Sequence, residues 1–318
     1  MKYLRAVIGL AACVLTGAVQ AESLSGGPFI VDFHPDDRKA AEDGLRYLLE
    51  ARDEFEARLP LGDGPVTLRI AHDMNEFLGL TGVYAHVGVT GVTRADRNAI
   101  AVKSPRFRSI EDDYRGTVRH ELLHILLHRN TDTARLPRWL NEGICMMLSN
   151  EARWQSTIDV TRMHLTGQII SMPVLEQTFR APGGDRQFGD AYAQALSMTR
   201  HLHNQLGEER FWAVVSAMNN TSFENAMASA GGLAVADFWD DYTRGLWGLS
   251  LVTTLRTGSF WGVIAFLCLF AFVVRWRRNR RIVRRWEEEH AEDVAEVFDW
   301  DRILDDAEAW KRGPGGEA

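Results

Sequence analysis

Two short stretches, His120-Glu121-Leu122-Leu123-His124 and Arg138-Trp139-Leu140-Asn141-Glu142-Gly143, decide how the chain is interpreted. Residues four apart on an α-helix share one face, so the two histidines of the first stretch stack. Their apolar neighbours indicate a buried helix, where imidazole and carboxylate groups are costly unless something pairs with them. The spacing predicts a zinc site in which both histidines bind the metal and the intervening glutamate reaches a water. Buried structural histidines are the alternative.

The third ligand must come from further along the chain. His128 continues the four-residue series, but it lies about 12 Å along the helix from His120, too far to share one ion. The metzincin spacing needs a histidine at position 130, where this chain has Asn130. Glu142 remains, on a helix that a turn ending near Pro137 folds back against the first. The sequence therefore favours Glu142.

The two stretches together resemble the gluzincin clan of metallopeptidases, which carry His-Glu-x-x-His and a downstream glutamate on a second helix. The strand and hairpin expected before the first stretch are similar to those of the peptidase-MA-like bacterial families. The resemblance covers roughly residues 28 to 210. It implies a zincin-like domain in which Glu121 is the general base and Zn²⁺ is the cofactor. The zinc ligands that it implies are His120, His124 and Glu142.

The chemistry of these residue types agrees with the resemblance. Three protein ligands leave a fourth position open, as catalytic zinc requires. Zinc acidifies a water and polarises the scissile carbonyl, and Glu121 would carry the proton to the leaving amine. An oxyanion partner is also expected, and related families often place a tyrosine where this chain has Tyr192. A core aromatic packed beside Leu196 is the other interpretation of that tyrosine.

One position departs from the family pattern. Thermolysin-like members have an acid four residues after the ligand glutamate, and this chain has Met146 there. The side chains that orient the ligand histidines are therefore not identified, and Asp112, Asp113 and Asp190 are unranked candidates. This leaves open a descendant that has lost activity.

Hydrophobic periodicity predicts an α+β domain with a small N-terminal sheet and a helical C-terminal half. The strands are expected at 29–33, 66–70 and, as a hairpin turning at 96–98, within 82–103. An edge strand in that hairpin would offer a peptide-binding surface. The helices are expected at 36–59, 74–78, 111–150 with a break near 130–137, 157–165, 190–206, 208–218 and 235–246.

Both ends of the chain carry topogenic patterns. Residues 1–21 have the basic start, apolar core and small residues of a signal peptide; a lipoprotein box ending at Cys13 is the lesser alternative. Residues 257–275 predict one C-terminal transmembrane helix, flanked by Trp261 and Trp276 and followed by seven arginines. Residues 22–250 then form the extracytoplasmic domain, and 276–318 form a cytoplasmic basic segment and acidic tail.

The charge and the cysteine count exclude several classes of function and kinds of site. The formal net charge of −7 argues against nucleic-acid binding. Of three cysteines only Cys145 lies in the exported part, which excludes an intrachain disulfide and a structural zinc site built on cysteines. We expect a single-pass, zinc-dependent metallopeptidase of a bacterial inner membrane acting on a peptide or protein. The alternatives are an inactive zincin-like envelope protein that binds a partner or peptide, and a metallohydrolase of a non-peptide substrate.

Overall fold

The computed structural model describes residues 21–82, 89–107, 113–150, 153–180, 185–297 and 300–311. The predicted signal peptide lies outside the described residues except for Ala21. The chain divides into one unit that ends at Thr253 and a second that begins at Thr254, and each is described by itself.

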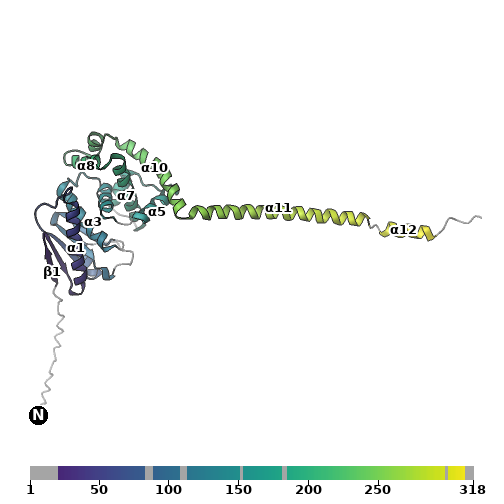
Figure 1. The fold of residues 1–318 in the computed structure, drawn as a ribbon, viewed down its shortest axis with the longest axis horizontal. Coiled ribbons are helices and arrows are strands. Elements are labelled where there is room, and N and C mark those ends of the chain that lie inside the picture. Colours follow the sequence, from purple (N-terminus) through teal and green to yellow (C-terminus); the bar gives the residue numbers. More distant parts are fainter. Residues whose placement is uncertain are drawn as a thin grey trace, which may run out of the picture. The chain divides into compact units, whose positions relative to one another are not determined.

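A five-stranded mixed sheet forms the N-terminal half of the first unit (Figure 1). Its order is β1 (Glu22–Gly26), β2 (Phe29–Phe33), β3 (Val66–Ala71), β5 (Ala99–Lys103) and β4 (Gly91–Arg94). The three central strands are parallel, and β1 and β4 pair antiparallel at the edges. Alternate side chains of β2 are buried, as expected for a sheet with one face on the core. The hairpin expected in 82–103 is thus present as β4 and β5, and residues 83–88 lie outside the described part.

Helices cover the sheet and build the other half. Their bounds are α1 (Arg38–Phe55), α2 (Met74–Thr81), α3 (Tyr114–Asn130), α4 (Arg138–Ser149), α5 (Arg153–Leu165), α6 (Met172–Arg180), α7 (Asp185–Leu206), α8 (Glu208–Ala217), α9 (Phe223–Ala226) and α10 (Val235–Arg256). Helix α3 contacts α1, β4, β5 and α4, so it lies between the sheet and the helical half. Most of its residues from Gly116 to Leu127 are buried, and the leucines and isoleucine of its second half pack into the core on all sides.

The α+β architecture and most predicted elements are confirmed. Strand β1 and helices α6 and α9 were not predicted. Strand β1 has one large apolar residue, Leu24, and is a strand because it pairs residue for residue with β2. Helix α6 carries Pro173 in its first turn, where proline is well tolerated.

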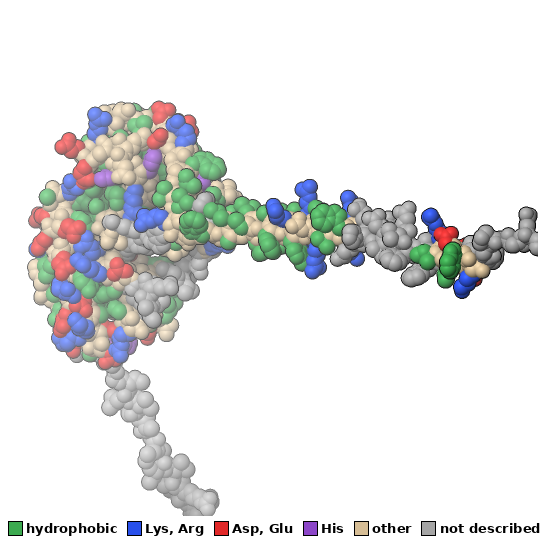
Figure 2. Space-filling view, turned by 45° about the vertical axis from the view of Figure 1, so that its right-hand side comes forward, with side chains coloured by type: hydrophobic (Ala, Val, Ile, Leu, Met, Phe, Trp, Pro, Cys, Tyr) green, Lys and Arg blue, Asp and Glu red, His purple; other side chains and the backbone are tan. Residues whose placement is uncertain are grey.

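The second unit consists of α11 (Ser259–Val297) and α12 (Trp300–Lys311). Helix α11 begins after a turn at Gly258, whose φ is 74°, rather than at residue 257 as predicted. Figure 2 shows hydrophobic side chains along its first part, followed by basic side chains, which are all arginines in this helix. By length and hydropathy no single described helix qualifies as a membrane span; Val235–Arg256 and Trp261–Trp286 qualify only as a pair with a break between them.

Candidate metal centre and catalytic cleft

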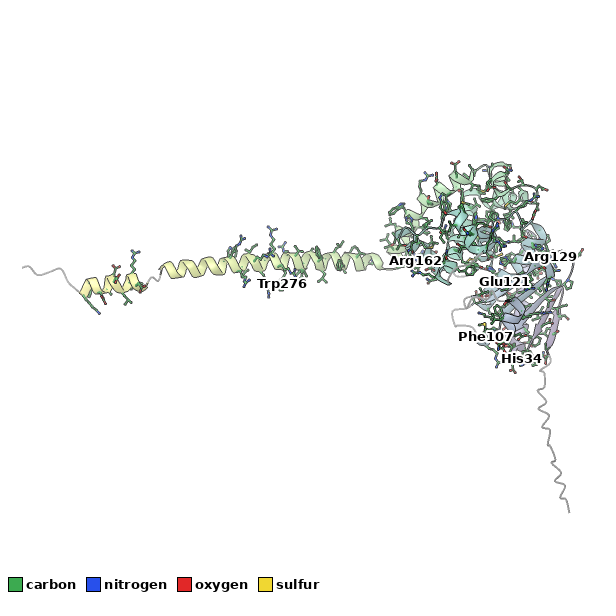
Figure 3. All side chains as sticks on the ribbon, turned by 180° about the vertical axis from the view of Figure 1, so that it is seen from behind. His34, Phe107, Glu121, Arg129, Arg162 and Trp276 are labelled. Carbon is green, nitrogen blue, oxygen red and sulfur yellow. The ribbon has the colours of Figure 1, made fainter. Side chains whose placement is uncertain are left out.

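The His-Glu-x-x-His stretch lies in the middle of α3, where the helix passes under the sheet edge. His120 and Glu121 are buried, and His124 is partly exposed. Figure 3 labels Glu121, which lies inside the first unit between the sheet and the helices. The helix continues for six residues beyond His124, so the histidine pair is held by complete helical turns on both sides.

Three ligand-type atoms converge from α3 and α4. Nε2 of His120 and Nε2 of His124 lie 3.1 Å apart. Oε2 of Glu142 lies 3.4 Å from the first nitrogen and 3.5 Å from the second. Ligands about 2.0–2.1 Å from a tetrahedral zinc ion are separated from one another by roughly 3.3 Å. The three separations therefore fit three corners of a zinc tetrahedron.

The electrostatics of this triangle also fit a cation. Oε2 of Glu142 is buried and accepts no hydrogen bond of good geometry from the described residues. A buried carboxylate oxygen without a donor is costly unless a positive charge lies beside it. Cys145 also comes close enough to His120 and His124 to share an ion. However, its Sγ is hydrogen-bonded to the other ring nitrogen of His124, at 3.4 Å, so Glu142 is the better third ligand.

The side chain that orients His124 is Asn141, which the sequence interpretation missed. Its Oδ1 lies 2.8 Å from Nδ1 of His124. An amide oxygen accepts from Nδ1–H, so it fixes the tautomer in which the Nε2 lone pair faces the metal position. Two of the three predicted orienting acids lie elsewhere. Asp190 is ion-paired with Arg162, and Asp113 is exposed at the start of α3.

Asp112, the third predicted orienting acid, lies outside the described residues. Asn141 directly precedes Glu142. Its place in the Trp-Leu-Asn-Glu-Gly stretch is the only feature of the sequence that could have indicated its role beside His124. One turn of α4 thus supplies both a ligand-type oxygen and the acceptor that orients a ligand-type imidazole.

Strand β4 holds the carboxylate of Glu121. The hydroxyl of Thr93 donates to Oε2 of Glu121 at 2.7 Å. A Cβ atom added at Gly91 would lie 2.7 Å from Oε1 of the same carboxylate, closer than real Cβ contacts allow. Glycine is therefore required where the strand passes over the helix. The edge strand and the predicted base are therefore in direct contact.

The ionisation of the cluster follows from its burial and its charges. Burial raises the pKa of Glu121, and the nearby His120 and His124 offset this only in part. Burial also opposes ionisation of Glu142, but His124 and His120 outweigh it and hold its pKa below the usual range. Burial would lower the pKa of His124, yet the neighbouring Cys145 and Glu142 raise it well above its ordinary value. Metal binding to Nε2 of His124 must then release a proton.

A cavity of about 600 Å³ opens over these residues. The edge strand lines one side through residues 91–93, and α3 and α4 form the floor. Tyr192, the predicted oxyanion partner, lines the same cavity. Its ring packs edge-on against Phe179 and Phe188, with centroids 5.2 and 4.7 Å away. The structure therefore brings Tyr192 into the cleft with the other predicted site residues, within an aromatic cluster.

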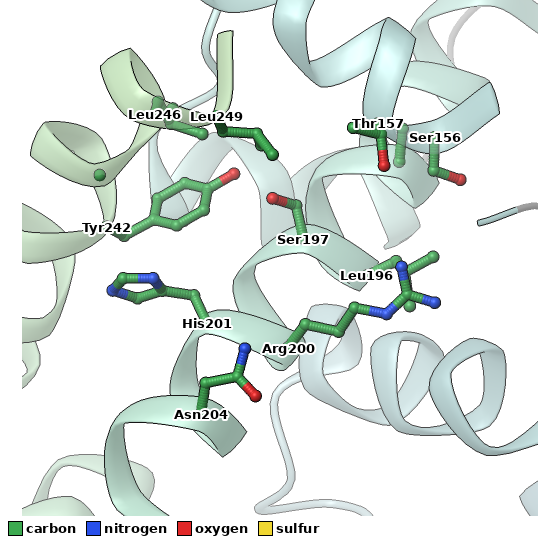
Figure 4. Close-up of a pocket in the computed structure, with 12 residues that line it drawn as sticks. Ser156, Thr157, Leu196, Ser197, Arg200, His201, Asn204, Tyr242, Leu246 and Leu249 are labelled. Atoms are coloured by element: carbon green, nitrogen blue, oxygen red, sulfur yellow. The ribbon is translucent and has the colours of Figure 1, made fainter. Parts of the chain in front are cut away.

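A smaller cavity of about 290 Å³ lies between α5, α7 and α10, away from these residues (Figure 4). The phenol of Tyr242 points toward Ser197 in it, and burial raises the pKa of that phenol. His201 on its wall is bonded to Asp241 at 3.0 Å. None of the predicted site residues lines this cavity.

Comparison with protein families assigns the domain. The chain belongs to the Peptidase MA superfamily, whose model matches residues 60–247, more than half of the chain. The match runs from the segment before β3 into α10 and includes both α3 and α4. No curated protein matches the chain. The family assignment agrees with the resemblance found in the sequence and supports a peptidase-like domain.

Proposed function

We propose that the chain is a membrane-anchored, zinc-dependent metallopeptidase. The observation that carries the proposal is the triangle of two imidazole nitrogens and one carboxylate oxygen, spaced at 3.1, 3.4 and 3.5 Å. The ligands are His120, His124 and Glu142. Zinc would polarise a peptide carbonyl and acidify a water in this cleft.

The side chains around the triangle have separate roles. Glu121 accepts a proton from the attacking water and delivers it to the leaving amine, and Thr93 and Gly91 hold its carboxylate in place. Asn141 keeps His124 in the tautomer that presents Nε2. Tyr192 is proposed to donate a hydrogen bond to the developing oxyanion. The outer edge of β4 is proposed to pair with the substrate main chain, since β4 is an edge strand that lines the cavity.

The membrane anchor is proposed from the residues that follow the domain. The apolar run of α11 exposes its large side chains, such as Trp261 at 67% and Phe270 at 61%. The last turns of α10 are apolar and exposed as well, with Trp247 at 69% and Leu251 at 60%. Apolar surface of this extent supports burial in lipid, and the arginines after Val274 support a cytoplasmic C-terminus. The domain would then face the periplasm of a bacterial inner membrane.

Metal analysis and a peptide library test the proposal. Full-length protein should contain about one zinc per chain and cleave peptides, and Glu121→Gln should keep the zinc while losing hydrolysis. Glu142→Ala should lose the zinc. Protein without stoichiometric zinc would refute the metal centre. Zinc-loaded protein whose Glu121→Gln form supports growth like the wild type would instead favour the inactive, partner-binding alternative.

A further inference from the structure

A third and larger cavity of about 830 Å³ lies beside the catalytic cleft, between the start of α4, α6, α9 and the start of α10. We call it the apolar groove. Large apolar side chains dominate its lining, namely Leu136, Pro137, Trp139, Met172, Phe223 and Trp239. Its volume is in the range of pockets that bind small ligands or several side chains of a peptide.

The apolar groove adjoins the catalytic cleft. Leu136 and Arg180 line both cavities. The guanidinium of Arg180 is largely exposed and donates to Glu176 at 3.3 Å. A guanidinium has five N–H donors, so others can reach carbonyl oxygens of a chain passing from one cavity to the other. An extended polypeptide that crosses this shared wall would contact both cavities.

The floor of the apolar groove is fixed before any ligand binds. The ring of Trp139 stacks on Phe238, with centroids 6.2 Å apart and planes 11° apart. It also meets Phe223 edge-on at 5.8 Å. Glu176 on the opposite wall accepts a hydrogen bond from the backbone N–H of Arg138, in the first turn of α4. A preformed apolar wall lowers the entropic cost of binding an apolar side chain.

We infer that the apolar groove binds large apolar side chains of the same polypeptide that is cleaved in the catalytic cleft. The inference rests on the proposed peptidase function and adds the substrate class: segments with two or more bulky apolar residues near the scissile bond. The occupant is a peptide because the apolar groove shares a wall with a cleft bordered by an edge strand, where a main chain can pair. Arg135 and Glu224 at the rim supply polar partners for its backbone.

Binding can be measured without hydrolysis in the Glu121→Gln background. The full chain is placed in lipid nanodiscs, and fluorescence anisotropy follows a labelled decapeptide with a central Leu-Phe-Leu. A second decapeptide carries three serines in place of that run. Ala236 is exposed and lines the apolar groove, so Ala236→Trp fills it. The matched control is Ala213→Trp, an exposed alanine of α8 that lines none of the cavities described here.

The Leu-Phe-Leu peptide should bind about tenfold or more tightly than its serine counterpart. Ala236→Trp should remove most of that preference, and Ala213→Trp should keep it. Ser171→Trp blocks the apolar groove from the opposite wall and should repeat the result, which guards against misfolding of one variant. Equal binding by the wild-type sequence and both blocking variants overturns the inference. Blocking variants that bind the peptide normally but associate less with vesicles identify lipid as the occupant and also overturn it.

The same measurements separate this inference from the proposed function. One outcome is that apolar peptides bind, that Ala236→Trp weakens this binding, and that the enzyme with Glu121 never cleaves them. This would refute the peptidase activity, whereas the inference that the apolar groove binds apolar side chains would stand. Cleavage at a rate that depends neither on apolar residues in the peptide nor on Ala236→Trp would support the peptidase activity and refute the inferred role of the apolar groove.

Discussion

Helix α4 carries Asn141 and Glu142, and at the next residue, Gly143, it packs closely against α7. A Cβ atom at Gly143 would lie 2.0 Å from the hydroxyl oxygen of Thr199 and 2.7 Å from the carbonyl oxygen of Ala195. Neither distance is possible for a real methyl group. Gly143→Ala must therefore move α4 relative to α7. Overpacking of a buried contact costs up to about 3 kcal/mol, and we expect the upper end because one obstructing atom belongs to the main chain.

Helix propensity opposes this cost and must be subtracted. Alanine is favoured over glycine in a helix interior by about 1 kcal/mol, so the net loss is about 2 kcal/mol. For a domain of 150–250 residues this lowers Tm by roughly 4–8 °C. Circular dichroism or scanning fluorimetry of the full chain measures the shift. Zinc affinity, measured by competition with a chelator, should fall too, because Glu142 moves with the helix.

A matched glycine and a second-site change sharpen the test. Gly248→Ala introduces the same methyl group in α10, where nothing lies within 4 Å, and should leave Tm unchanged or slightly raised. Thr199→Ala removes a buried hydroxyl that has no hydrogen-bond partner among the described residues, so it should cost little. In Gly143→Ala it should restore part of the loss, because the carbonyl of Ala195 remains in the way. A Gly143→Ala protein with wild-type Tm and zinc affinity would refute the packing argument.

Three further predictions concern the metal and the base. Asn141→Ala should weaken zinc binding about 10- to 100-fold, because His124 loses the acceptor that fixes its tautomer; an unchanged Kd in a chelator competition would contradict that role. Gly91→Ala should displace the carboxylate of Glu121 and lower kcat about a hundredfold at unchanged zinc content, as checked by metal analysis and steady-state kinetics. Chelation of zinc should lower stability by about 4 kcal/mol when free zinc had been 1,000 times Kd, whereas Glu142→Ala should show no chelator-dependent change in unfolding.

The ligand-type residues could be predicted because their geometry is local to single helices. The spacing of His120 and His124 fixes their common face once the segment is helical, and the leucines around them indicate a buried helix. Glu142 required one further step, the return of a second helix after a short turn. The strands of the sheet could also be predicted from local patterns. Alternating and continuous apolar runs mark β2, β3 and β5.

The missed features depend on how elements cross. Whether Asn141 reaches His124 depends on the angle and offset between α4 and α3, which no spacing within α4 encodes. The need for glycine at position 91 arises from a strand 30 residues before Glu121 passing over that side chain. Asp190 was a reasonable orienting acid by type, but the structure pairs it with Arg162 on α5. Residue type alone therefore did not identify Asn141 as the partner of His124.

The first turns of α4 connect these observations physically. Successive residues on a helix point about 100° apart, so a stretch of five can face three neighbours at once. Trp139 lies under the apolar groove, Asn141 and Glu142 face α3, and Gly143 faces α7. The start of the helix is held by Glu176 from the groove wall. Because a helical turn moves as a body, the groove, the metal ligand and its orienting amide cannot be displaced independently of one another.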